Sequence, residues 1–233
     1  MPIHRGPALP YSVVAGVTPW GRRWLVATAK VHTATFVPES PQVFDSFVEV
    51  LGQYPAYAVV VVNAPIGYVD EGTRTCDVEA RRLLGDRRAA LQYAPPRSVL
   101  AESNLGPYLG LNVMAASLLA RYREVAAEMS PYRQRVVYEG HPELSFYNLN
   151  DDVPLRWSKL REEGREERRA LLERRIQGVG KIIDADIPGL PVKHLLDVAA
   201  LVWTARRVLG RAAKRIPSDA EWDSEGIRME YVY

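Results

Sequence analysis

The first candidate for chemistry in this chain is Asn63, in the stretch "VVVVNAPIGY" at residues 59–68. The valine run predicts a strand that is buried on both faces, because continuous apolar runs are typical of such strands. Asn63 follows the run directly, at the point where α/β proteins usually place their functional groups. The residue is a neutral amide and not an acid, and this choice bears on whether the chain is a working enzyme.

A second candidate is the stretch "VVYEGHPELSF" at residues 136–146. Glu139 ends a predicted strand, and His141 and Glu143 follow within four residues. A carboxylate at a strand end beside a histidine could bind a metal or transfer a proton. For Glu143 we favour a structural role in the first turn of a helix after Pro142, where negative charge is favourable. For Glu139 we favour a functional role, and His141 stays undecided.

The third candidate is Asp197, which lies in "LLDVAALVWTA". This segment is apolar nearly all round, which predicts a buried helix. A buried carboxylate without a partner costs several kcal/mol. Asp197 therefore needs a cation, a hydrogen-bond donor or a cavity. An ion pair with Arg74 or Arg81 and a role in ligand binding are the two alternatives.

Basic residues fall into two groups. Residues 156–175 hold eight basic and five acidic side chains, a mixture typical of a solvated helix face, with nucleic-acid contact as the alternative. The end of the predicted last long helix carries positive charge that the helix dipole favours and that could also follow a phosphate backbone. This second group consists of Arg206, Arg207, Arg211, Lys214 and Arg215. Cys76 and Trp203 are expected in the core.

The composition sets wide limits. The chain has 233 residues, a formal net charge of +2 and 47% hydrophobic residues, as expected for a globular protein with one core. A single cysteine excludes an internal disulfide and favours a cytoplasmic location. No signal peptide or membrane span is expected. No Gly-x-Gly-x-x-Gly turn or Gly-Lys-Ser/Thr loop indicates a nucleotide cofactor.

The order of predicted elements indicates an α/β protein with a mixed sheet covered on both faces. The predicted strands occupy residues 12–17, 23–31, 33–38, 57–65, 134–140 and 227–233. The first three form an antiparallel meander. The predicted helices occupy residues 40–54, 74–85, 107–129, 154–177 and 191–216, with a short helix after His141 and mostly loop over 87–100. Ser40 and Pro41 are expected to begin the first helix.

Several stretches occur together in a familiar order. They are "TPWGRRW", "NAPIGY", "RTCDVEARRLLGDRR", "APPRSVL", "YEGHPELSF", "SKLREEGREERRALL" and "LLDVAALVWTARR". Together they resemble a family of uncharacterised proteins, of the domain-of-unknown-function 429 type, that are predicted nucleases with a ribonuclease-H-like fold. The similarity spans roughly residues 14–232. It implies one domain over 1–233 with a five-stranded mixed sheet, a loose arm at 1–11 and helical insertions at 86–130 and 150–190.

Ribonuclease-H-like nucleases hold two divalent metals with carboxylates, and the metals activate a water. The resemblance implies a site for Mg²⁺ or Mn²⁺ on Glu139 and Asp197, with His141 as a further catalytic residue. The substrate-binding residues that it implies are Arg74, Arg81, Arg97, Lys159 and Asn63. The positions that match the family are Glu139, His141, Glu143, Asp197, Arg74, Asp77, Arg81, Arg97 and Lys159.

The chain departs from the family at the acids. Relatives usually carry acids where Thr18 and Asn63 stand, and two more where Lys193 and His194 stand. Hard Mg²⁺ sites depend on carboxylates. Two hypotheses follow: metal-dependent phosphodiester hydrolysis with a partly degraded acidic site, or a catalytically silent relative that binds a nucleic acid, a nucleotide or a protein. The sequence leaves the oligomeric state and the substrate open.

Overall fold

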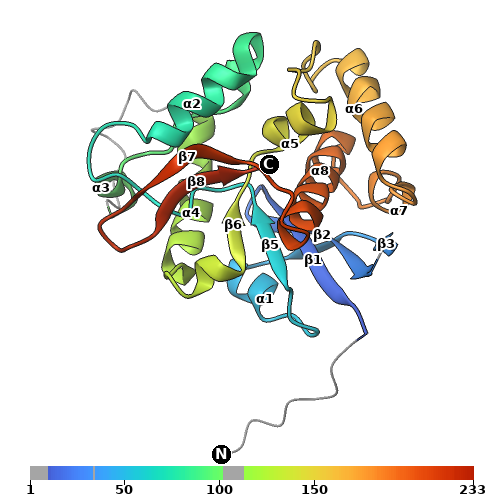
Figure 1. The fold of residues 1–233 in the computed structure, drawn as a ribbon, viewed down its shortest axis with the longest axis horizontal. Helices are drawn as coiled ribbons and strands as arrows, with labels where there is room; N and C mark the ends of the chain where they lie inside the picture. Colours follow the sequence, from blue (N-terminus) through green and yellow to red (C-terminus); the bar gives the residue numbers. More distant parts are fainter. Residues whose placement is uncertain (1–9, 34, 102–112) are drawn as a thin grey trace, which may run out of the picture.

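The computed structural model describes residues 10–33, 35–101 and 113–233. Its main sheet has the strand order β3-β2-β1-β5-β6, as seen in Figure 1. These strands are β1 Ser12–Trp20, β2 Arg23–His32, β3 Thr35–Pro38, β5 Val59–Val62 and β6 Val137–Glu139. β1, β2 and β3 pair antiparallel, whereas β5 runs parallel to both β1 and β6. The predicted mixed sheet, with its meander followed by parallel strands, is confirmed.

The number of strands differs from the prediction. A sixth strand, β4 (Gln42–Phe44), pairs with β2, where the sequence favours the start of a helix over 40–54. Only α1 (Phe47–Leu51) of that helix forms, and Ser46 caps it in place of Ser40. Pairing of residues 42–44 with β2 outweighs the helical spacing of their apolar side chains. The last predicted strand forms β8 (Arg228–Val232), which pairs with β7 (Arg215–Trp222) in a separate two-stranded sheet.

Both faces of the main sheet are covered, as its continuous apolar strands predict. Alternate side chains of β1 and β5 point to opposite faces. Val14, Val59 and Val61 lie in one core with α8 (Val192–Leu209). Ala15, Val17, Val60 and Val62 lie in a second core with α1 and α4 (Val113–Glu128). Figure 1 shows α5 (Pro142–Leu149), α6 (Glu162–Arg175) and α7 (Gly180–Ile183) grouped around α8.

The helix α8 lies unusually close to β1 at Gly16. A Cβ atom added there would lie 2.6 Å from the carbonyl oxygen of Val198 and 2.6 Å from the amide nitrogen of Val202. Both contacts are with backbone atoms, which cannot rotate away. Thr18 lies two residues further along β1, on the same face. The missing side chain of Gly16 therefore brings the Asp197 turn of α8 to the strand that carries Thr18.

Other helices are shorter than predicted. α8 ends at Leu209 and the chain then turns through Arg211, which has a φ of +56°, into β7. Residues 154–161 do not continue α6, because Glu167 accepts hydrogen bonds from the backbone N–H groups of Arg156 and Trp157 and holds this segment in a turn. α2 (Thr75–Leu84) ends before Gly85, as predicted. The stretch 87–100 contains parts of two short helices, η1 (Gly85–Ala90) and α3 (Arg97–Ala101).

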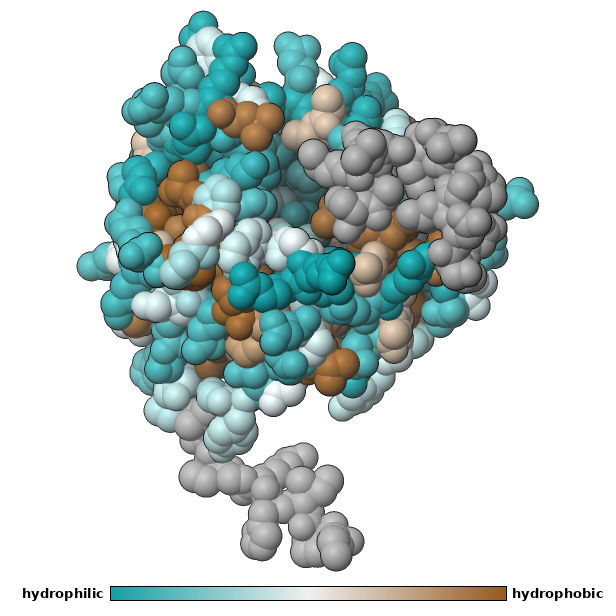
Figure 2. Space-filling view, turned by 180° about the vertical axis from the view of Figure 1, so that it is seen from behind, coloured by the Kyte–Doolittle hydropathy of each residue, from teal (hydrophilic) through white to brown (hydrophobic). Residues whose placement is uncertain are grey.

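Several predictions reach beyond the described residues. Residues 1–9 of the predicted arm and residues 107–112 of the predicted third helix lie outside them. The same holds for residue 34 of the predicted strand 33–38 and for residues 102–112 of the predicted insertion 86–130. Within the described part of the chain, no helix is long and apolar enough to cross a membrane. The face of the molecule in Figure 2 is largely hydrophilic, and its hydrophobic residues occur in separate groups. This face therefore has the mixed surface that is normal for a folded domain.

Candidate functional site

The candidate site lies where the three parallel strands end. Val17 of β1 is in register with Val62 of β5, and Val62 is in register with Glu139 of β6. The residues that follow these positions are therefore neighbours at one edge of the sheet. The side-chain amide of Asn63 donates a hydrogen bond of 3.1 Å to the hydroxyl of Thr18. Two of the positions at which the resemblance implies acids thus meet, and they form a neutral pair.

A cavity of about 130 Å³ lies at this edge. It contains four of the predicted site residues: Asn63, Glu139, His141 and Lys159. The other described residues that line it are Ala64, Pro65, Ala90, Gln92, Ala94, Leu118, Tyr122, Gly140 and Tyr231. For comparison, a cavity of about 150 Å³ accepts one benzene ring. The enclosed space therefore suits a single ring or a group of similar size.

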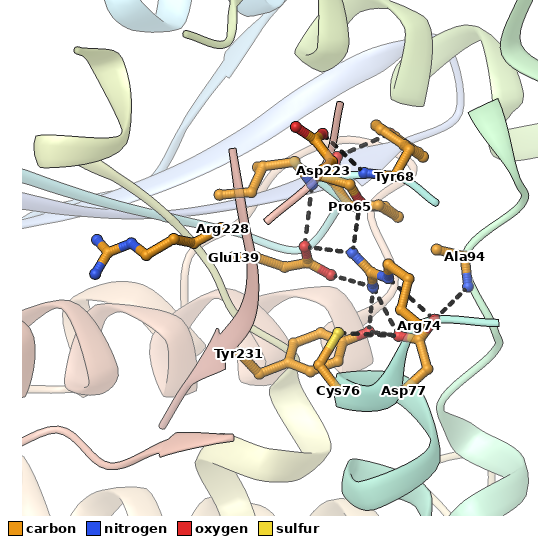
Figure 3. A network of polar contacts seen from close by, with 12 residues as sticks. Pro65, Tyr68, Arg74, Cys76, Asp77, Ala94, Glu139, Asp223, Arg228 and Tyr231 are labelled. Atoms are coloured by element: carbon orange, nitrogen blue, oxygen red, sulfur yellow. Dashed lines mark hydrogen bonds and ion pairs between the residues drawn. The ribbon is translucent and has the colours of Figure 1, made fainter. Parts of the chain in front are cut away.

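Glu139 forms one wall of the cavity and is held by Arg74, as Figure 3 shows. Nη1 of Arg74 lies 2.8 Å from Oε2 of Glu139, and Nη2 lies 2.7 Å from Oε1. The backbone N–H of Ile66 also donates to Oε2, at 3.0 Å. The side chains of Arg74 and Glu139 are almost completely buried. This ion pair spans 65 residues of sequence and joins the start of α2 to the end of β6.

The same guanidinium binds a second carboxylate, that of Asp77. Its Nη2 lies 2.6 Å from Oδ1 and its Nε 3.1 Å from Oδ2 of Asp77. The hydroxyl of Tyr231 donates to Oδ1 at 2.7 Å, and the backbone N–H of Ala94 donates to Oδ2 at 2.9 Å. One buried positive charge therefore faces two carboxylates (Figure 3).

The two carboxylates have opposite pKa shifts. Burial raises the pKa of Glu139 above its ordinary value, and the charge and hydrogen bonds of Arg74 oppose this only in part. Burial also acts to raise the pKa of Asp77, but the charge of Arg74 and the bonds from Arg74, Ala94 and Tyr231 outweigh it, so that this pKa is lowered. Asp77 is therefore the firm partner of Arg74, and Glu139 is the carboxylate whose charge is poorly compensated.

Asp197 has a different partner from those that the sequence offered. It pairs with Lys159 through Oδ2, and neither Arg74 nor Arg81 contacts it, so the predicted ion pair was wrong. Its side chain is 2% exposed, and Oδ1 has no hydrogen-bond partner among the described residues. Asp197 does not itself line the cavity, whereas Lys159 does. The structure thus connects Asp197 to the cavity through the ammonium group of Lys159.

His141 caps the helix α5. Its Nδ1 accepts a hydrogen bond of 3.2 Å from the backbone N–H of Glu143, so the proton of the neutral ring is on Nε2. Burial, with the nearby charge of Lys159, lowers the pKa of His141 to about 3. Glu143 lies in the first turn of α5, as predicted, and its carboxylate pairs with the buried Arg168 at 2.5 Å. His141 is therefore a neutral side chain at the cavity wall, and its other ring nitrogen bonds to the backbone of Ala90.

Arg81 and Arg97, two of the predicted substrate-binding residues, do not line the cavity. Arg81 donates to the backbone carbonyls of Arg88 and Leu91. Arg97 forms ion pairs with Asp223 at 2.6 Å and Glu225 at 2.5 Å in the turn after β7. Both arginines thus hold loops in place. The third predicted arginine, Arg74, contacts two residues of the cavity lining, Glu139 and Tyr231.

The basic residues at the end of α8 and just after it have partners of different kinds. Lys214 pairs with Asp152, and Arg215 pairs with Glu230. Arg206 stacks on the ring of Phe36, with its guanidinium carbon 4.9 Å from the ring centroid. Arg207 donates to the backbone carbonyl of Ala212. Lys214 and Arg215 are therefore compensated by carboxylates, whereas Arg206 and Arg207 contact neutral groups.

The sequence did not single out three residues of the cavity: Gln92, Tyr122 and Tyr231. Tyr231 lies in a predicted strand, "MEYVY", whose position beside β6 depends on the long chain between them. Gln92 lies in a stretch read mostly as loop, which carried no motif. Its local signal is limited to a polar side chain two positions after the end of η1.

The residues at this edge do not fit a resident pair of metal ions. Glu139 already accepts three hydrogen bonds, two of them from Arg74, and Asp197 is paired with Lys159. Thr18 and Asn63 supply only neutral oxygens. In the described part of the chain, no group of three or more His, Cys, Asp or Glu side chains is placed to hold a metal ion. Two cations next to the carboxylates would repel a divalent ion.

Comparison with known proteins agrees with the motifs of the sequence. A family model described as "Protein of unknown function (DUF429)" matches residues 16–222. No curated protein and no solved structure matches the chain. The match covers most of the 233 residues. This chain therefore belongs to the DUF429 family of proteins of unknown function.

Proposed function

We propose that this protein binds a nucleotide, or the end of a nucleic-acid strand, in the cavity at the edge of the main sheet, and that it does so without a two-metal cage. We also propose that the fold is ribonuclease-H-like, which the three antiparallel strands followed by two parallel strands support. The protein would then be a relative of nucleases that still binds a nucleotide or nucleic-acid end but no longer hydrolyses phosphodiester bonds.

One observation carries the proposal: the cavity has neutral hydrogen-bonding groups where a nuclease needs acids. Asn63 uses one amide N–H on Thr18, and Gln92 uses one on the carbonyl of Ala89, at 2.8 Å. Each amide keeps a second N–H and a carbonyl oxygen. Such paired donors and acceptors match the edges of a nucleobase, and the volume of about 130 Å³ suits one ring.

The apolar part of the lining supports the same ligand. Leu118, Ala64, Pro65 and the ring of Tyr122 border the cavity. Base-binding pockets commonly combine stacking on apolar or aromatic side chains with polar groups at the base edge. Asn63 is then explained as an amide that recognises a ligand, and not only as a lost metal ligand.

Asn63→Asp tests this proposal. The change removes the amide donor and adds a negative charge beside Glu139, so the affinity for nucleosides and nucleotides is expected to fall about tenfold or more, equivalent to about 1.4 kcal/mol. Calorimetric titration of the four common mononucleotides into wild type and variant measures it. Asn150→Asp, at the end of α5 and outside the cavity lining, is the matched control and should bind as wild type does.

The opposite result would favour an enzyme. If Asn63 marks only a lost metal ligand, Asn63→Asp should create cleavage of single-stranded DNA or RNA in Mn²⁺. Such a gain of activity, with no nucleotide binding by the wild type, would overturn the proposal.

Metal-dependent phosphodiester hydrolysis is the second candidate function, and one observation favours it. Oδ1 of Asp197 is buried without a partner among the described residues, and a buried carboxylate oxygen of this kind attracts a cation. Mg²⁺ often keeps several waters and uses only one or two protein carboxylates. Glu139 and Asp197 are the residues that would hold such an ion.

A further inference from the structure

A second hollow adjoins the cavity and shares Lys159 with it. This hollow has a volume of about 340 Å³. The described residues that line it are Lys159, Leu160, Arg165, Pro191, Val192 and Lys193. Three of the six are cations and none is an acid. Lys193 is one of the two residues that stand where the resemblance to nucleases implies acids.

The positive charges of this hollow are only partly compensated. Lys159 pairs with Asp197. Arg165 donates to the backbone carbonyl of Leu160 at 3.0 Å, which is a neutral partner. Among the described residues, neither Arg165 nor Lys193 forms an ion pair. Two positive charges are therefore left without a carboxylate. The hollow also borders the first residues of α8, an 18-residue helix with no side-chain cap, whose positive dipole end adds to the same field.

The positive charge of this hollow indicates which kind of anion would fit it. A terminal phosphate carries a charge of about −1.5 to −2 at neutral pH, whereas a phosphate inside a nucleic-acid strand carries a single charge. Two uncompensated cations match the terminal phosphate better. Lysine and arginine are also the side chains that bind phosphate oxygens most strongly.

We infer that the hollow of Lys159, Arg165 and Lys193 is a phosphate subsite, and that the ligand is a mononucleotide whose ring occupies the adjoining cavity and whose terminal phosphate occupies this hollow. The inference rests on the proposed function and narrows it from nucleic acids and nucleotides to phosphomonoesters. Lys159, which belongs to both hollows, lies where the two parts of the ligand would join. With a lysine at position 193, this site would bind an anion rather than a metal ion.

The test compares three ligands by calorimetry: a nucleoside, its 5′-monophosphate and its cyclic 3′,5′-monophosphate, which is a diester. The monophosphate is expected to bind at least tenfold more tightly than the other two. Lys193→Gln should weaken binding of the monophosphate about tenfold and leave the nucleoside within about twofold. Lys181→Gln, an exposed lysine beside a different hollow, is the matched control and should change neither.

The outcomes separate the two proposals. If none of the three ligands binds, the proposed function fails and this inference fails with it. If the nucleoside and both phosphates bind equally and Lys193→Gln has no effect, the cavity binds a ring but the phosphate subsite is wrong. A loss of phosphate binding in Lys181→Gln and not in Lys193→Gln would place the phosphate elsewhere and also overturn the inference.

Discussion

Replacing Arg74 by methionine is expected to lower the free energy of unfolding by about 3–5 kcal/mol, because the change leaves buried charges without their partner. Asp77 and Glu139 would then face each other in the interior with no cation between them. Native domains are stable by only about 5–15 kcal/mol, so the variant should be close to unfolding. Urea denaturation, followed by circular dichroism, measures the change.

Arg82→Met, on the same helix, is the matched control. Arg82 is exposed and makes no side-chain hydrogen bond or ion pair with the described residues. Its replacement should change the free energy by no more than about 0.5 kcal/mol. Adding Glu139→Gln to Arg74→Met should recover part of the loss, because one of the two uncompensated charges is removed. Equal stability of Arg74→Met and Arg82→Met would show that the network does not hold the fold together.

Asp77→Asn is expected to cost about 3 kcal/mol, and Glu139→Gln about 1 kcal/mol or less. Asp77 accepts four hydrogen bonds from nitrogen and hydroxyl donors, and an amide has only one oxygen with which to replace them. At least two buried donors lose their partners, at about 1–3 kcal/mol each. Gln at position 139 keeps the two bonds to the Oε2 position and removes a carboxylate whose pKa is raised.

The pH dependence of stability should also differ between the variants Asp77→Asn and Glu139→Gln. The pKa of Asp77 lies below its ordinary value of 3.8, so its stabilising effect is complete above that pH and is lost as the pH falls through the lowered pKa. Asp77→Asn should lack this loss. The pKa of Glu139 lies above 4.5, so ionising it costs stability as the pH rises above that value. Glu139→Gln should lack this cost. The same pH profile in both variants would contradict these assignments.

The parallel part of the sheet could be predicted because its signal is local. The run of valines at 59–62 is buried throughout, and Asn63 and Glu139 lie at one edge because the strands are parallel. The structure of residues 40–54 was harder to predict. Their apolar side chains fit a helical period, and only contact with β2 decides that residues 42–44 form a strand.

The partners of the buried charges could not be predicted. Lys159 and Asp197 are 38 residues apart, and Arg74 and Glu139 are 65 apart. The sequence shows that Asp197 needs a cation, but several cations are available, and the choice depends on how the turn before α6 packs against α8. The role of His141 as a helix cap has a local signal, since the residue directly precedes Pro142 and an acidic first turn. A histidine close to two carboxylates in the sequence also suggests metal binding or proton transfer, and this alternative hid the capping role.

The most direct test of the account is a calorimetric titration of a 5′-mononucleotide into the wild-type protein, once in EDTA and once in Mn²⁺, with Asp197→Ala in parallel. If the protein binds the nucleotide without a metal, the dissociation constant should be the same in both solutions, Mn²⁺ alone should give no heat, and the nucleotide should be intact at the end. Binding of Mn²⁺ that Asp197→Ala abolishes, with nucleotide binding or phosphodiester cleavage only when the metal is present, would contradict it.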